Sequence, residues 1–234
     1  MCIRDRVNVL DNNQQIAACQ SKLIDAQTGK VQSLGGLQGV YGGKSKIHEP
    51  KIDKQGIIRG IFYPVGAAVL IRRSVLLRCG GFDEKLFYGD VDLGWRLRLL
   101  GYDIVVNPFS KCYHYGSYAT KKFVPSLQLS YHTFREKLRI LLKVYSLQNL
   151  LKRICFWAAV SFSYAVYLSI KTKRPHIFSW VKAILWNLRN FSDTLSARNY
   201  IQRLRKISDN DVEKYMLSNP AEIYFWRSRL NEYK

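Results

Sequence analysis

Residues 89–107 read GDVDLGWRLRLLGYDIVVN, and this stretch predicts a helix followed at once by a buried strand. Four of its residues recur at helical spacing: Leu93, Arg96, Leu97 and Leu100. Gly101 stands directly after them, where a helix commonly ends in a left-handed residue. The run DIVVN (103–107) is then short and apolar, as expected for a buried strand, and Pro108 closes it.

The neighbouring segments extend this pattern in both directions. Residues 67–71 (AAVLI) predict a buried strand that is entered through Gly66, and residues 74–79 predict a helical turn closed by two glycines. Residues 111–116 (KCYHYG) predict an extended segment. The order strand, turn, helix, strand is typical of an α/β sheet. Upstream, the glycine-rich residues 35–60 predict a long mobile loop, with a disordered insertion as the alternative.

The composition indicates a folded chain with an anionic partner. The 234 residues are 47% hydrophobic and carry a net charge of +20, which is enough apolar material for a sizeable core. The charge is uneven, at +6 over residues 1–120 and +14 over residues 121–234. Lipid head groups or nucleic acid would suit such a basic second half. The five cysteines form no CxxC pair and predict neither a zinc site nor a disulfide framework.

The second half predicts a series of helices. Residues 126–150 and 177–206 are amphipathic and basic, and a capped helix is expected to begin at Ser208 or Asp209. Between them, residues 154–170 form an uncharged run bracketed by Lys and Arg. This run is at the short limit for crossing a membrane, so a helix at the membrane interface, a buried helix and a true span all remain open. We expect residues 121–234 to dock on the cytoplasmic face of the membrane.

Asp90 and Asp92 admit three interpretations. They could hold a divalent cation together, since hard cations bind carboxylate oxygens. Asp92 could instead cap a helix that begins at Leu93. Asp90 would then lie in the preceding loop, free to act as a general base.

A series of short motifs runs from Gly66 to Ser117. They are Gly66-Ala67-Ala68, Gly80-Gly81-Phe82-Asp83-Glu84, Asp90-Val91-Asp92-Leu93 with Arg96, Gly101-Tyr102, Pro108 and His114. In the order and spacing of these motifs, the stretch closely resembles the second half of the catalytic domain of family 2 glycosyltransferases. The similar members are rhamnosyltransferase-like enzymes that build cell-surface polysaccharides, and the resemblance covers roughly residues 8–120. The sequence departs from the usual pattern at Gly89, where the family more often has an acidic residue.

The resemblance implies a partial GT-A fold, a doubly wound α/β domain over residues 1–118, followed by a basic helical region over residues 119–234. It implies inverting transfer of a sugar from a nucleoside-diphosphate donor to a glycan or lipid-linked acceptor, with Asp90 as the base. We expect Mg²⁺ or Mn²⁺ as the cofactor and His114 as a metal ligand, with a surface or core histidine as the alternative. The residues expected to bind substrate are Gly66, Ala67, Asp92, Trp95 and Arg96.

Several alternatives stay open beside these assignments. Arg96 could reach the phosphates, but we prefer an ion pair with Asp92, because residues four apart on a helix face each other. Trp95 could line the acceptor site or pack in the core. The family's nucleotide-binding first half is not found before Val7, so we expect a truncated chain. The rival function is a non-catalytic basic protein that binds membranes or nucleic acid, although no recognised nucleic-acid motif is present and no nucleic acid is expected.

Overall fold

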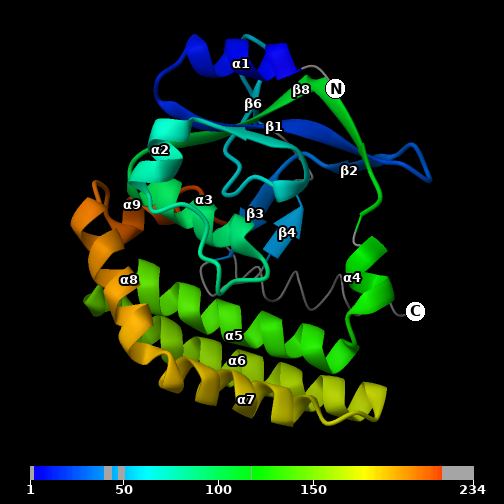
Figure 1. Ribbon diagram of the computed structural model, residues 1–234, viewed down its shortest axis with the longest axis vertical. Helices are drawn as coiled ribbons and strands as arrows, with labels where there is room; N and C mark the ends of the chain where they lie inside the picture. The colour runs from blue at the N-terminus through cyan, green and yellow to red at the C-terminus, as the bar shows by residue number, and fades with distance from the viewer. Residues whose placement is uncertain (1–2, 40–43, 47–50, 117, 218–234) are drawn as a thin grey trace. The chain divides into compact units, whose positions relative to one another are not determined.

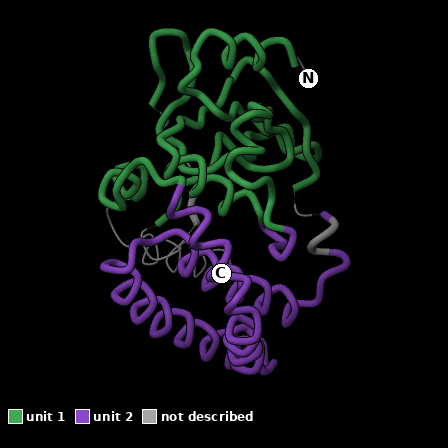
Figure 2. Tube along the Cα trace, turned by 60° about the vertical axis from the view of Figure 1, so that its left-hand side comes forward, with its two compact units in different colours: residues 1–83, 89–116, 204–234 green, residues 84–88, 117–203 purple. Residues whose placement is uncertain are grey.

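The computed structural model describes residues 3–39, 44–46, 51–116 and 118–217 of the chain. It is an α/β protein in which a curled mixed sheet with flanking helices is followed by a helical C-terminal region. Two compact units are distinguished in Figure 2. The α/β unit comprises residues 1–83, 89–116 and 204–234, and the helical unit comprises residues 84–88 and 117–203. These two units interleave along the chain and are not the two domains predicted from the sequence, which meet at residues 118 and 119. The predicted domain division stays a prediction.

The sheet of the α/β unit is built around two long parallel strands. These are β1 (Ile16–Asp25) and β8 (Asp103–His114). The order along the sheet is β2-β1-β8-β6-β5, and β7 pairs with the first half of β1. All pairs other than β1 with β8 are antiparallel, so the sheet is mixed. The shorter strands are β2 (Val31–Ser33), β5 (Lys51–Ile52), β6 (Ile58–Arg59) and β7 (Val69–Ile71).

Helices cover both faces of this sheet. Figure 1 shows α1 (Ile3–Asp11) on one side of β1, and α2 (Arg73–Arg78) and α3 (Gly89–Leu99) on the other. The alternation of side chains along the strands explains both contacts. Val105 on β8 packs with Leu10 of α1, whereas its neighbours Ile104 and Val106 pack with Leu93 and other residues of the α3 side.

Both predicted helix ends in this unit are confirmed. Gly101 follows α3 with φ +84°, and its N–H donates to the carbonyl of Arg98, while the next N–H donates to Leu97. Gly80 follows α2 with φ +87° and makes the equivalent bond to Leu77. In both places a glycine in the left-handed conformation allows the N–H groups after the helix to donate to carbonyls of its last turn.

Two predicted strands have different bounds from those expected. Residues Gly66–Ala68 form a 3₁₀ turn, and the strand begins only at Val69. Strand β8 does not end at Pro108 but continues to His114. Its register with β1 shifts between Asn107 and Lys111, so Pro108 lies in a bulge, where its missing N–H costs no ladder bond.

The segment 35–60 contains more regular structure than a mobile loop. Strand β3 (Gly36–Gln38) pairs with β4 (Lys44–Lys46), and β5 pairs with β6 across a turn that Asp53 holds by accepting from the N–H groups of Gln55 and Ile57. Residues 40–43 and 47–50 lie outside the described residues. The expectation of a structureless loop is therefore wrong where the chain is described.

The second half of the chain is helical, as predicted. The helical unit contains α4 (Tyr118–Phe123), α5 (Ser126–Val144), α6 (Leu147–Thr172), α7 (His176–Arg189) and most of α8 (Phe191–Leu204). The short helix α9 (Asp209–Glu213) belongs to the α/β unit, and the Ser208 hydroxyl caps it by accepting from the N–H of Asp211 at 3.2 Å.

Gly94 permits α3 to pack closely against the backbone of residues 62–63 and provides a first prediction. A Cβ at this position would lie 2.9 Å from Tyr63 Cα and 3.0 Å from the Phe62 carbonyl oxygen, so backbone would have to move. Overpacking of this kind typically costs about 1–3 kcal/mol. We expect Gly94→Ala to lower the urea midpoint of unfolding accordingly. Gly66→Ala is the control, because nothing lies within 4 Å of its Cβ position; equal midpoints for the two variants would contradict the packing.

Two histidines of the helical unit provide a second prediction. Burial and Arg135 lower the pKa of His132, and burial and Arg174 lower the pKa of His176. The unfolded chain therefore takes up these protons first as the pH falls. The contribution of these two histidines to the free energy of unfolding is therefore complete above the ordinary histidine pKa of about 6.5. It is lost as the pH falls from there through the lowered pKa values of the folded protein.

We expect the Tm to be lower at pH 5.5 than at pH 7.5, with a smaller difference in the double variant His132→Asn/His176→Asn. Thermal melts at the two pH values test this. An unchanged difference in the double variant would assign the loss of stability to other groups.

Candidate active site

The first turn of α3 contains both aspartates. The helix begins at Gly89, so Asp92 is its fourth residue and Asp90 its second. The predicted helix cap at Asp92 is therefore wrong, and Asp90 does not lie in a loop before the helix. The physical reason is that Asp92 finds its partner one turn further along the helix rather than at a free backbone N–H.

Asp92 and Arg96 form a buried ion pair, as preferred from the sequence. Asp92 is 0% exposed, and its Oδ2 lies 2.9 Å from Nε and 2.8 Å from Nη2 of Arg96. Arg96 Nη1 also donates to the carbonyls of Cys79, at 2.7 Å, and Gly81, at 2.5 Å. The pair therefore ties α3 to the end of α2. Neither side chain is placed to contact a substrate from solvent.

Asp90 lies two residues before Asp92 in the same turn, but in a different environment. Its side chain is part-exposed, and its Oδ1 accepts a hydrogen bond from the N–H of Val91 at 2.9 Å. Tyr63 lies close enough that the negative charge of Asp90, together with the larger effect of burial, raises the pKa of the Tyr63 phenol. The first turn thus presents one carboxylate to solvent and encloses the other.

Gly66 and Ala67 are exposed at the 3₁₀ turn before β7. The turn is held at its start, where the N–H of Val65 donates to the buried Gln20 side chain of β1 at 2.6 Å. Nothing lies within 4 Å of the position that a Gly66 Cβ would occupy. The main chain is therefore uncovered at this turn, and substrate binding by Gly66 and Ala67 stays a prediction.

Trp95 lies in the core and does not face solvent. It is 1% exposed, and its ring meets Phe62 edge-on with 5.0 Å between centroids. The expectation that Trp95 lines an acceptor site is not met in this structure, and the packing alternative describes it.

His114 lies at the end of β8 and already has a side-chain partner. Its Nδ1 lies 2.7 Å from Oε1 of Gln32 on β2. Among the described residues, no group of three or more His, Cys, Asp or Glu side chains is placed to hold a metal ion. The described residues therefore do not form a divalent cation site by themselves, and a bound Mg²⁺ or Mn²⁺ stays a prediction.

Two further side chains were not found from the sequence. Tyr63 lies beside Asp90, but nothing in its sequence context distinguishes it. Glu136 of α5 is 3% exposed and accepts hydrogen bonds from the N–H groups of Phe87, at 2.7 Å, and Tyr88, at 2.9 Å. It is the one acidic residue between Asp103 and Asp193 in a strongly basic stretch. That isolation is the signal that could have identified it.

A scan against protein-family models and a search of curated proteins found no match to this chain.

The buried pair provides a third prediction. Removing one partner of a buried ion pair typically costs about 3–5 kcal/mol, because the other charge is left uncompensated. We expect Asp92→Asn to lower the free energy of unfolding by this amount in urea titrations. The matched control is Asp211→Asn, which removes an exposed ion pair between Oδ1 and Lys214 Nζ at 2.6 Å and should lower the free energy of unfolding far less, because exposed ion pairs contribute little. Similar losses in the two variants would contradict the structural role of Asp92.

Proposed function

We propose that this protein takes part in glycosyl transfer, moving a sugar from a nucleoside-diphosphate donor to a hydroxyl of a cell-surface polysaccharide or lipid-linked glycan. The observation that carries the proposal is the division of the two aspartates in the first turn of α3. Asp92 is enclosed with Arg96, while Asp90 is part-exposed. This supports the role that the family resemblance assigns to Asp90.

The proposed chemistry is an inverting displacement with Asp90 as the general base. The carboxylate accepts the proton of the acceptor hydroxyl as that oxygen forms a bond to the anomeric carbon of the sugar. The bond from the same carbon to the diphosphate oxygen breaks, and the nucleoside diphosphate leaves with the electron pair. Attack from the side opposite the leaving group inverts the configuration.

The surroundings of Asp90 support this role in two ways. The Asp92–Arg96 pair fixes α3 against α2, so that the base is carried on a rigid element. The exposed turn Gly66–Ala67 leaves its backbone open to a ligand. A partial GT-A domain, with donor binding at the carboxyl ends of the parallel strands, is the finer fold assignment within this proposal.

The test is a transfer assay with the protein expressed from its whole reading frame. Radiolabelled UDP-, GDP- and dTDP-sugars serve as donors, and a glycolipid and polysaccharide extract of the producing cells serves as the acceptor. We expect incorporation of label from at least one donor. Asp90→Asn should reduce this incorporation by about 10²–10⁴-fold, the usual contribution of a general base.

Two comparisons make the result specific. Asp11→Asn changes an exposed aspartate of α1 and should transfer at the unaltered rate. Donor binding, measured by calorimetry, should be the same for Asp90→Asn as for the unaltered protein. Transfer by Asp90→Asn within a factor of two of the unaltered rate would refute the base role. No transfer from any donor would favour the non-catalytic alternative.

A further inference from the structure

Helix α7 has its polar side chains buried and its large apolar side chains exposed. The buried residues are His176, Ser179, Ala183 and Asn187. The exposed apolar residues recur at helical spacing along the other side of the helix: Phe178, Val181, Leu185 and Leu188. Phe178 is 67% exposed and Leu188 is 64% exposed. A helix that packs its apolar side against a core would have the reverse arrangement.

The buried side of α7 is held to α5 by hydrogen bonds. Ser179 Oγ donates to the Leu127 carbonyl and Asn187 Nδ2 to the Arg135 carbonyl, both at 3.0 Å. His176 Nδ1 lies 2.8 Å from the Ser130 hydroxyl oxygen. Small residues and polar side chains that bond across helices are typical of helix contacts within lipid, where apolar side chains gain nothing by turning inward.

Helix α6 repeats the arrangement. Its buried residues are Trp157, Ser161 and Ala165, and the Ser161 hydroxyl accepts from the Trp180 indole of α7 at 2.8 Å. Leu151 and Ile170 on this helix are 71% and 75% exposed. Within the described part of the chain, α6 is the single helix long and apolar enough to cross a membrane, a test that core helices of soluble proteins also pass. Here exposure of the apolar side chains excludes the core explanation.

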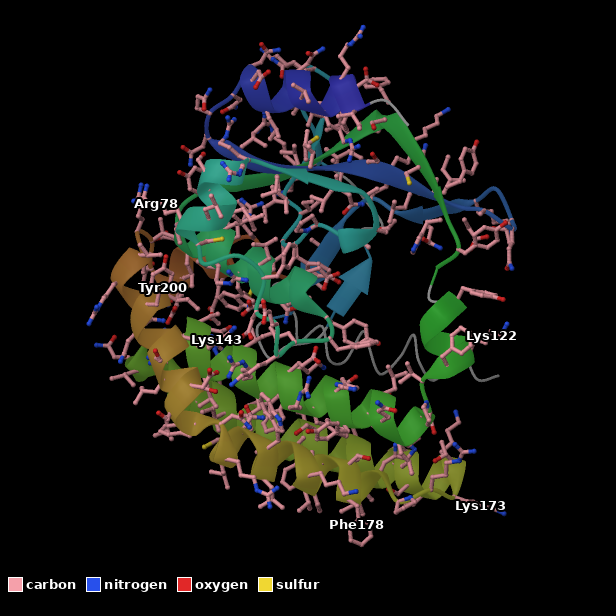
Figure 3. All side chains as sticks on the ribbon, in the orientation of Figure 1. Arg78, Lys122, Lys143, Lys173, Phe178 and Tyr200 are labelled. Carbon is pink, nitrogen blue, oxygen red and sulfur yellow. The ribbon has the colours of Figure 1, made fainter. Side chains whose placement is uncertain are left out.

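The two exposed sides are continuous and adjoin basic residues. Phe162 of α6 meets the Trp180 ring of α7 with 5.3 Å between centroids, which joins the apolar surfaces. Residues 147–190 contain seven basic residues and no Asp or Glu. The seven are Lys152, Arg153, Lys171, Lys173, Arg174, Lys182 and Arg189. Figure 3 shows Phe178 and Lys173 pointing outward from α7 and from the turn before it.

We propose that the outward surface of α6 and α7 binds an anionic phospholipid bilayer, with both helices lying in the plane of the interface. The apolar side chains enter the boundary between head groups and acyl chains, and the basic side chains contact the anionic head groups. Bilayer binding by α6 and α7 does not depend on the proposed sugar transfer, because the chemistry at Asp90 does not require a membrane.

The lengths and charges favour lying in the plane over crossing the bilayer. Helix α7 has 14 residues, so it is about 21 Å long, short of the hydrocarbon thickness of about 30 Å. Lys182 is exposed in the middle of α7, between Val181 and Leu185. Helix α6 is flanked by basic residues at both ends, and an in-plane orientation keeps both ends among the head groups.

The test is flotation of the purified full chain with two kinds of vesicle. One is phosphatidylcholine alone, and the other contains about 30% phosphatidylglycerol. We expect binding to the anionic vesicles that is at least tenfold tighter than binding to the neutral ones and weaker at high salt, as charge attraction requires. Phe178→Gln/Leu188→Gln should reduce the partition coefficient for anionic vesicles at least tenfold, because two exposed apolar side chains are lost.

Two further double variants test whether a loss of vesicle binding is specific to the surface of α6 and α7. Leu77→Gln/Phe109→Gln removes two exposed apolar side chains of the α/β unit and should bind like the unaltered chain. Lys173→Gln/Lys182→Gln should lose most of the preference for anionic vesicles without a change in the circular dichroism spectrum. All the substituted side chains are exposed, so folding is expected to be retained.

Three outcomes would overturn the proposal. The first is an absence of binding to anionic vesicles at low salt. The second is resistance of the bound protein to extraction with alkaline carbonate, which would indicate a true span. The third is a dimer without vesicles that Phe178→Gln/Leu188→Gln dissociates, which would assign the surface to a second copy of the chain.

Discussion

The enclosure of α3 on all sides is the constraint on which the α/β unit depends. Every residue from Val91 to Leu99 is buried, including one aspartate and two arginines. Enclosed charges are tolerated only when each is paired or hydrogen-bonded. Arg96 is satisfied by Asp92 and two carbonyls after α2, and Arg98 by the Ile61 carbonyl at 2.6 Å and Asp103 at 2.8 Å. These bonds fix α2, the segment before β7 and the start of β8 around one helix.

The same constraint determines what the first turn of α3 can do. Because Asp92 is 0% exposed and its Oδ2 is paired with Arg96, it is not placed to meet a substrate that approaches from solvent. Asp90 lies two residues earlier, where the helix leaves the core, and is part-exposed. A carboxylate at that position is rigidly held yet open to solvent, which are the two conditions that a general base must meet. The role proposed for Asp90 as a base thus depends on the ion pair of Asp92 with Arg96, which holds α3 in place.

The sequence predicted those features that rest on local stereochemistry. Gly101 and Gly80 mark helix ends because few other residues adopt a positive φ, and the Ser208 cap is equally local. It failed where two local rules competed. The sequence predicts both a helix cap at Asp92 and its pair with Arg96; the pair is present, and the cap is wrong because α3 begins at Gly89. Pro108 usually ends a strand, but a bulge opposite β1 absorbs it. Glu136 binds a segment distant in the chain, which no local pattern records.

The sequence correctly predicts that the second half is helical, but not the helix breaks at residues 145–146 and at Asn190. Periodicity also could not show which side of each helix faces outward. The side chains settle this. In water, burying Ser179 and Asn187 while exposing Phe178 and Leu188 would forfeit about 25 cal/mol for each Å² of apolar surface left hydrated. The buried hydrogen bonds offset little of that loss, since each contributes only about 1 kcal/mol net. Against acyl chains the apolar side costs nothing, and the polar side must turn inward to find partners. The arrangement of α6 and α7 is therefore the one expected if this surface binds a bilayer, as proposed.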